Sequence, residues 1–127
     1  IRTRVDGSDP LGWGMREEAA ASFQRSRAFR IVAPAREGDR SARREVDVVA
    51  RYAEDDLLMS GWELGAREHL GGRPAMVRVP LGRGQVVLIG FRPQFRGQPH
   101  GTFKLVFNSI LAATMERVPG GESMTPE

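Results

Sequence analysis

The chain has 127 residues, of which 40% are hydrophobic and 28% are charged, and this length and composition predict a single globular domain with one core. It contains no cysteine, which excludes disulfides, thiolate nucleophiles and cysteine-ligated zinc within these residues. The formal charge is only +3, and acidic residues are interspersed with the basic ones, so we expect no nucleic-acid partner.

The N-terminal segment is predicted to form a short strand and then a helix. Residues 2–5 have a strand-like pattern, and the Gly-, Asp- and Pro-rich stretch that follows them is typical of a loop. Met15, Ala19 and Phe23 recur at a spacing of four residues, so we expect a helix over 15–24 with these side chains on one face.

Two further strands are expected in the middle of the chain, with a polar loop between them. Residues 29–33 and 45–52 have strand-like patterns, and in the second of these the apolar side chains alternate along one face. Residues 34–44 are polar and charged, which indicates a flexible surface loop.

A β-hairpin is predicted in the C-terminal half. The runs 75–81 and 85–91 are separated by three residues that include two glycines, which is typical of a hairpin connection. The second run is apolar almost throughout, so we expect it to be buried on both faces and central in the sheet. Its apolar residues are far too few to cross a bilayer, and we expect no membrane partner.

The last element is predicted to be an amphipathic helix that begins after Thr102, an expected N-cap, and ends near Arg117. Apolar side chains recur along it at helical spacing, and we expect them to pack in the core: Phe103, Val106, Phe107, Ile110 and Leu111. We assign residues 1–118 to the domain and residues 119–127 to a disordered tail. Strands interleaved with helices predict an α/β fold.

One segment carries a family resemblance. The string GFRPQFRG at residues 90–97, within the stretch 82–108, resembles the closing section of the domain that follows the peptidase unit in large bacterial zinc carboxypeptidases. Residues 10–15 and 58–65 also resemble that domain, in the same order. The domain is in turn similar to class I glutamine amidotransferases. The resemblance therefore implies a flavodoxin-like three-layer α/β sandwich with a mostly parallel sheet and a terminal β-hairpin, present here as an incomplete copy.

The resemblance also implies that the chain is not an enzyme. In class I glutamine amidotransferases the matching strand ends in Phe-His-Pro-Glu, whose His is the general base for a cysteine nucleophile and whose Glu orients that His. Here the tetrapeptide is FRPQ, with Arg92 at the position of the base and Gln94 at that of the carboxylate. Arginine stays protonated up to about pH 12 and glutamine carries no charge, so neither side chain replaces its counterpart. We therefore expect no catalytic residue and a non-catalytic accessory role: packing, oligomerisation or binding of substrate termini.

Four polar side chains follow the C-terminal end of the presumed central strand, where open α/β sheets bind ligands: Arg92, Gln94, Arg96 and His100. We take them as the candidate ligand or interface site. The planar donors of Arg92 and Arg96 suit a carboxylate, either of a ligand or of another domain. In the alternative interpretation both arginines pair with acids of their own domain, such as Asp6, Asp9 or Glu63.

No cofactor is expected in this chain. His69 and His100 are the only histidines, and neither lies in the His-x-x-Glu pattern of a carboxypeptidase zinc site, so no metal ligand is assigned. Zinc is expected only in the peptidase domain of the parent protein, which we expect to be a metallocarboxypeptidase. The expected partners are that peptidase domain and a second copy of the chain in a homo-oligomer. The first residues suggest a fragment of a bacterial protein whose targeting signal lies outside it, so its localisation stays open.

Two other functions remain open at this point. One is an active amidotransferase or hydrolase whose nucleophile lies upstream and whose base is His100, which requires that His100 points into the cleft at the strand end. The other is a free-standing module that binds a small carboxylate ligand.

Overall fold

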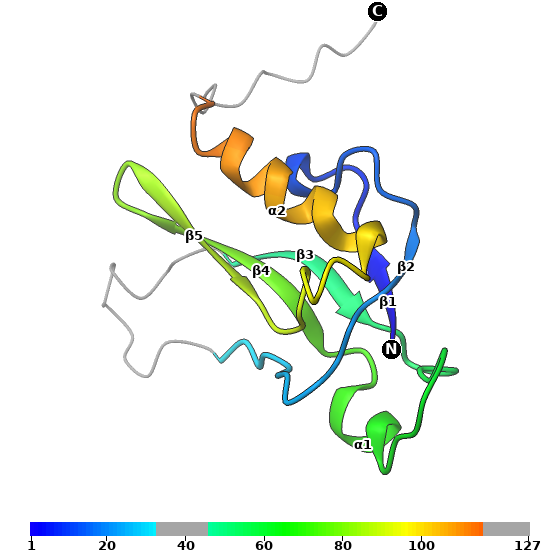
Figure 1. Ribbon diagram of the computed structural model, residues 1–127. Helices are drawn as coiled ribbons and strands as arrows, with labels where there is room; N and C mark the ends of the chain where they lie inside the picture. Colours follow the sequence, from blue (N-terminus) through cyan, green and yellow to red (C-terminus); the bar gives the residue numbers. More distant parts are fainter. Residues whose placement is uncertain (33–45, 116–127) are drawn as a thin grey trace, which may run out of the picture.

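The computed structural model describes residues 1–32 and 46–115, and it contains a five-stranded sheet of order β2-β1-β3-β4-β5 (Figure 1). Every neighbouring pair of strands is antiparallel. The strands are β1 (Arg2–Val5), β2 (Glu18–Ala20), β3 (Asp47–Tyr52), β4 (Pro74–Leu81) and β5 (Gly84–Ile89). The helices are a 3-10 turn, η1 (Pro10–Gly12), and two α-helices, α1 (Ala66–Leu70) and α2 (His100–Ala112).

The antiparallel sheet shows that the predicted flavodoxin-like sandwich with a mostly parallel sheet is wrong. Parallel neighbours need a crossover connection of a dozen or more residues, usually a helix, between the two strands. The described parts of the connections contain only η1 and α1, which has five residues, and a tight turn joins β4 to β5. Because the described chain supplies no crossover helix between strands, adjacent strands run in opposite directions.

The helix predicted over 15–24 is also wrong, because this segment contains β2. The apolar side chains that pack in or against the core are all at odd positions: Met15, Ala19, Ala21 and Phe23. Glu18 and Ala20, which lie between them, are exposed. A spacing of four residues is close to one helical turn, but it is also a multiple of the two-residue period of a strand. The alternation of core-facing and exposed side chains identifies the segment as a strand.

Four predicted strands are confirmed. The segment predicted at 2–5 is β1, the one at 45–52 contains β3, and the hairpin is formed by β4 and β5. The predicted central place of the last strand is wrong, because β5 lies at the edge of the sheet. Its side chains alternate: Val87 and Ile89 pack against the core, whereas Val86 and Leu88 are exposed.

The other predicted segments are placed differently or lie outside the described residues. Residues 29–32 form no regular strand, although the Phe29 N–H donates to the Pro74 carbonyl oxygen over 2.9 Å. Residue 33, the loop 34–44 and the tail 119–127 are not among the described residues. The predicted end of the last helix near Arg117 is wrong, because α2 ends at Ala112 and residues 113 and 114 form a turn.

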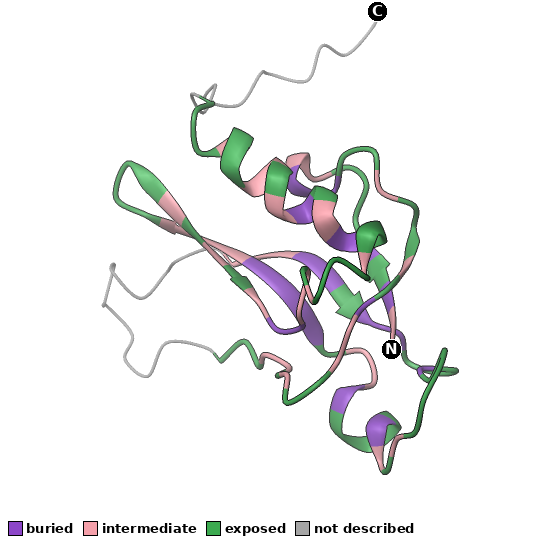
Figure 2. Ribbon diagram, viewed as in Figure 1, coloured by how far each residue is buried: buried purple, intermediate pink, exposed green. Residues whose placement is uncertain are grey.

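The core lies between the sheet and α2, which crosses one face of the sheet (Figures 1 and 2). Leu105 of α2, Leu11 of η1 and Met76 of β4 are fully buried there. At its border the guanidinium of Arg78 pairs with Asp9 over 2.9 Å and with Asp47 over 2.8 Å, which joins η1 to β3 and β4.

A second cluster closes the end of the sheet. Tyr52 is 1% exposed, and its hydroxyl donates to the Arg27 carbonyl oxygen over 2.7 Å. Its ring meets that of Phe23 edge-to-face, with centroids 5.6 Å apart. Burial raises the pKa of the Tyr52 hydroxyl well above its ordinary value, so it stays a neutral donor. This contact holds the segment after β2 against the sheet.

The apolar stripe of α2 faces away from the core, which corrects the prediction that it is buried. Thr102 and Leu105 are buried and Ala112 packs against the core, so this narrow, small-residue face of the helix lies on the sheet. Phe107 and Leu111, at about 60% exposure, point to the opposite side. Three side chains of α2 set this rotation by donating hydrogen bonds to backbone carbonyl oxygens. Thr102 donates to that of Pro93, Lys104 to that of Gly14, and Asn108 to those of Leu11 and Trp13.

Candidate functional site

The predicted site lies on the loop between β5 and α2, and backbone and side-chain hydrogen bonds hold this loop at both ends. At its start the Arg92 N–H donates to the Ser22 carbonyl oxygen over 2.9 Å, which attaches the loop to the segment after β2. At its end the Thr102 hydroxyl donates to the Pro93 carbonyl oxygen over 2.8 Å. Arg96 adopts a positive φ of 51°, which turns the chain back toward α2.

The structure brings Arg92 and Arg96 together around one aromatic ring. The guanidinium carbon of Arg92 lies 5.1 Å from the centroid of Phe95, and that of Arg96 lies 5.2 Å from it. Both distances are within the range of a cation–π contact. Arg92 also donates to the Gln24 side-chain oxygen over 3.3 Å. Each of the two cations is thus held by contacts with neutral groups.

The three acids named in the internal-pairing interpretation are engaged elsewhere. Asp9 pairs with Arg78, Asp6 accepts hydrogen bonds from Ser8, and Glu63 accepts from the Ala66 N–H. Within residues 1–32 and 46–115, neither Arg92 nor Arg96 forms an ion pair. Pairing with these three acids is therefore wrong, and a carboxylate from outside the domain stays a prediction.

Gln94 and His100 do not join this arginine cluster. Gln94 is exposed, and His100 is the first residue of α2, where its ring packs on Phe103 with centroids 5.2 Å apart. In the described part of the chain no carboxylate forms a hydrogen bond or ion pair with His100. The orienting acid that an active His100 would need is therefore not supplied by these residues.

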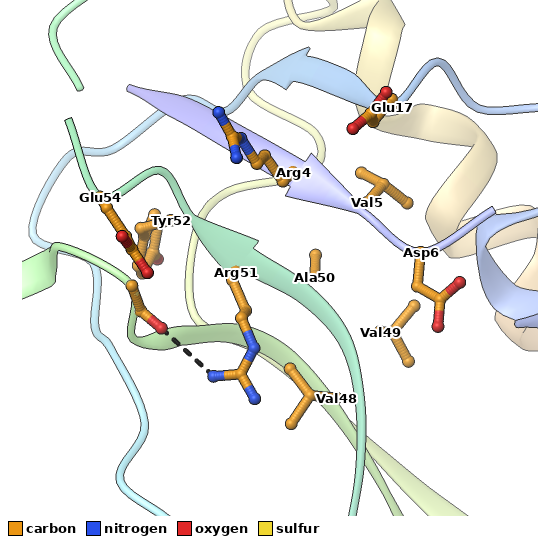
Figure 3. A pocket seen from close by; sticks show the side chains of 11 residues that line it. Arg4, Val5, Asp6, Glu17, Val48, Val49, Ala50, Arg51, Tyr52 and Glu54 are labelled. Atoms are coloured by element: carbon orange, nitrogen blue, oxygen red, sulfur yellow. Dashed lines mark hydrogen bonds between the residues drawn. The ribbon is translucent and has the colours of Figure 1, made fainter. Parts of the chain in front are cut away.

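A polar depression of about 360 Å³ lies over β1 and β3, and the sequence analysis missed it (Figure 3). Figure 3 shows Arg4 and Arg51 on neighbouring strands with Glu17, Glu54 and Asp6 around them. The Arg51 guanidinium donates to the Gly72 carbonyl oxygen over 3.2 Å. Hydrogen bonds from Ser8 lower the pKa of the Asp6 carboxyl. Because two guanidiniums and three carboxylates line it, the charges of the depression nearly cancel, and it marks no clear anion or cation site.

A groove lies beside β2, and the sequence analysis missed it as well. It consists of two adjoining hollows of about 630 and 700 Å³ between β2, the 58–62 loop and the 95–101 segment. We call it the β2 groove. No periodic signal in the sequence indicates it, because it depends on which strand occupies the edge of the sheet.

The third surface feature is the outward face of α2, formed by Phe107, Ile110, Leu111 and Met115. Each of these side chains is more than half exposed. Helical spacing in the sequence marked most of this set, but the sequence analysis assigned it to the core.

Comparison of the chain with protein-family models, curated proteins and solved structures finds no significant match. In the residues that the structure describes, no group of three or more His, Asp or Glu side chains is placed to hold a metal ion. None of the described helices is long and apolar enough to cross a membrane. Function therefore has to be argued from the surfaces themselves.

Proposed function

We propose that this chain is a non-catalytic accessory domain of a zinc carboxypeptidase-like protein, and that it docks on the peptidase unit through the outward face of α2. The observation that carries this proposal is the rotation of the helix. Its apolar stripe points to solvent, where Phe107, Ile110 and Leu111 are each about 60% exposed. A contiguous apolar face on a well-packed helix is typical of an interface.

The charge pattern of α2 supports an interface of this kind. No charged side chain occurs from residue 105 to residue 115, although 28% of the chain is charged. Depletion of charge and enrichment in aromatic and large aliphatic residues characterise the buried centre of protein interfaces. Trp13 adds a half-exposed aromatic ring, because Asn108 of α2 donates to its carbonyl oxygen and holds its loop beside the helix.

The identity of the partner comes from the sequence motif GFRPQFRG and not from the sheet, whose antiparallel order differs from the expected fold. The non-catalytic part of the proposal rests on side-chain chemistry. Arg92, which the sequence resemblance aligns with the base, has a guanidinium that cannot shuttle a proton near neutral pH, and Gln94 carries no charge. Both side chains suit binding and positioning.

The docking proposal is tested with two charge-introducing variants, Phe107→Asp and Leu111→Asp. Isothermal titration against the peptidase unit proposed as its partner should show that each variant binds at least about 30-fold more weakly than the unmodified chain, as expected for a buried centre. Leu64→Asp is the matched control, because Leu64 is 82% exposed and lies away from α2, in the loop before α1.

Two results would contradict the proposal. Equal binding by all three variants would remove the outward face of α2 from the interface. Release of ammonia from glutamine by the purified chain, at a rate above that of a blank without protein, would show that it is an enzyme.

A further inference from the structure

The β2 groove has the dimensions of a ligand site. Its two hollows, of about 630 and 700 Å³, share four lining residues: Ala20, Met59, Gln98 and Pro99. Volumes of 300–1,000 Å³ are typical of pockets that bury most of a small ligand. The hollows lie end to end along β2, because one is lined by residues 14–20 and the other by residues 20–23. The groove is therefore elongated in the direction of the strand.

The backbone of β2 presents free hydrogen-bonding groups to this groove. Ile1 and Ala21 exchange two N–H···O bonds, of 3.0 and 2.8 Å, and the Val5 N–H donates to Glu17 over 2.8 Å. Because bonded and non-bonded pairs alternate in an antiparallel ladder, the N–H and C=O groups of Glu18 and Ala20 point to the outer edge. Among the described residues, these groups have no backbone partner.

The same edge already pairs with another segment at Ser22, two residues after Ala20. The Ser22 carbonyl oxygen accepts the Arg92 N–H in an antiparallel bridge, and the chain then diverges from the edge along the 95–101 segment. The free edge at Glu18 and Ala20 thus lies between two loop walls. Strands pair at about 4.8 Å, so an extended chain that bonds to Glu18 and Ala20 would lie between these walls.

The two ends of the groove differ in character. The end at residues 20–23 is lined mainly by apolar side chains, among them Leu58, Trp62 and Phe95. The other end is lined by Arg16 and Lys104. The carboxylate of Glu18 at this end pairs with Arg2 over 2.6 Å, and Arg2 is shared with Asp56 over 2.8 Å, so these three groups leave a single negative charge against the two positive charges of Arg16 and Lys104. An excess of positive charge therefore remains at the end nearest Glu18.

We propose that the β2 groove binds the C-terminal residues of an extended peptide by antiparallel strand addition, with the peptide's terminal carboxylate beside Arg16 and Lys104. The direction follows from the sheet. β2 runs from Glu18 to Ala20, and all four strand pairs are antiparallel, so an added strand ends its chain at the Glu18 end, where the cations lie. Main-chain bonds supply affinity, and the carboxylate contact selects a free terminus.

This inference does not rest on docking through α2. The outward face of that helix begins at Phe107, whereas the groove is lined on α2 only by its first turns, from His100 to Lys104. Loss of docking in Leu111→Asp, with peptide binding unchanged, would leave this inference standing. Loss of peptide binding in a groove variant, with docking unchanged, would leave the docking proposal standing.

The probe is an N-terminally fluorescein-labelled heptapeptide of alternating valine and threonine with a free carboxyl terminus. Its fluorescence anisotropy should rise saturably with protein concentration. The same peptide with an amidated terminus should bind at least tenfold more weakly, because it lacks the negative charge. A version with every backbone amide N-methylated should not bind, because strand addition needs N–H groups on the edge that faces β2.

Protein variants test the contributions of the β2 edge and of the cations separately. Ala20→Pro removes an outward N–H while leaving the bonds between β1 and β2 intact, and it should abolish binding. Arg16→Gln should weaken binding of the free-carboxylate peptide but leave that of the amidated peptide unchanged. Arg30→Gln is the matched control, since Arg30 is exposed and does not line the groove. If Ala20→Pro fails to fold, the N-methylated peptide decides the same question with the unmodified protein.

Three results would overturn the proposal. The first is no binding of the free-carboxylate peptide at millimolar protein. The second is equal affinity for all three peptides. The third is a homodimer, detected by light scattering, that Ala20→Pro dissociates, because the edge would then pair with a second copy of the chain.

Discussion

The rotation of α2 gives the sharpest test of the structure, because the sequence pattern and the fold disagree on which side chains are buried. Two leucines on this helix provide matched perturbations, Leu105→Ala and Leu111→Ala. Leu105 is fully buried, whereas Leu111 is 61% exposed. Burial in the structure predicts that Leu105→Ala destabilises the chain more than Leu111→Ala does. The apolar stripe in the sequence predicts the opposite order, because it includes Leu111 and excludes Leu105.

The magnitudes follow from burial. Removing a fully buried leucine side chain down to alanine costs about 2–5 kcal/mol, so we take about 3 kcal/mol for Leu105. Full burial of a leucine is worth roughly 1.5–3 kcal/mol, and Leu111 is only two-fifths buried, so its truncation should cost about 1 kcal/mol or less. For a domain of this size, 1 kcal/mol corresponds to about 4 °C in Tm, which predicts shifts of about 12 °C and at most about 4 °C.

Thermal unfolding of the isolated chain, followed by circular dichroism, measures both shifts on the same helix. Leu105→Ile, which conserves volume, should lie between the unmodified chain and Leu105→Ala, and it keeps the comparison informative if the alanine variant does not fold. A larger loss of Tm in Leu111→Ala than in Leu105→Ala would refute the assigned rotation of the helix, and with it the outward apolar face.

Two further predictions concern charges. Arg78→Met leaves Asp9, whose side chain is 9% exposed, without its cation, so it should lower the free energy of unfolding in urea by about 2–4 kcal/mol. Asp47→Asn changes the more exposed partner of Arg78 and should cost less than half as much. Equal costs would contradict a role for burial. Asp6 has a lowered pKa because Ser8 donates to it, so its stabilising contribution is present above about pH 4 and is lost as the pH falls through that lowered pKa. The Tm difference between the unmodified chain and Asp6→Asn should therefore be constant from pH 7 to about pH 5 and shrink toward pH 2, and a difference that grows on acidification would contradict this.

Several elements could be predicted because local patterns identify them without reference to the rest of the chain. The strand at 2–5, the alternating strand that contains β3, and the hairpin of β4 and β5 follow from two-residue periodicity and glycine-bearing connections. The last helix was also found, although it begins at His100, three residues before the predicted start, and Thr102 lies inside it and does not cap it. The two arginines that contact Phe95 were found as a cluster, because they lie four residues apart on one loop.

Other features could not be predicted, because a local pattern does not specify its surroundings. The spacing of Met15, Ala19 and Phe23 fits both a helix and a strand, and only pairing with β1 selects the strand. Likewise, an apolar run such as β5 is compatible with a central or an edge position, and strand order decides between them.

The sequence by itself determined the absence of cysteine, the hairpin and the amphipathic character of α2, because each depends on composition or on neighbouring residues. The tertiary structure alone decided that the sheet is antiparallel, that the apolar stripe of α2 faces solvent, and that β2 has a free edge inside a groove. The physical reason is that periodicity fixes which side chains share a face, whereas long-range hydrogen bonds, such as those from Asn108 and Arg92, fix what that face meets.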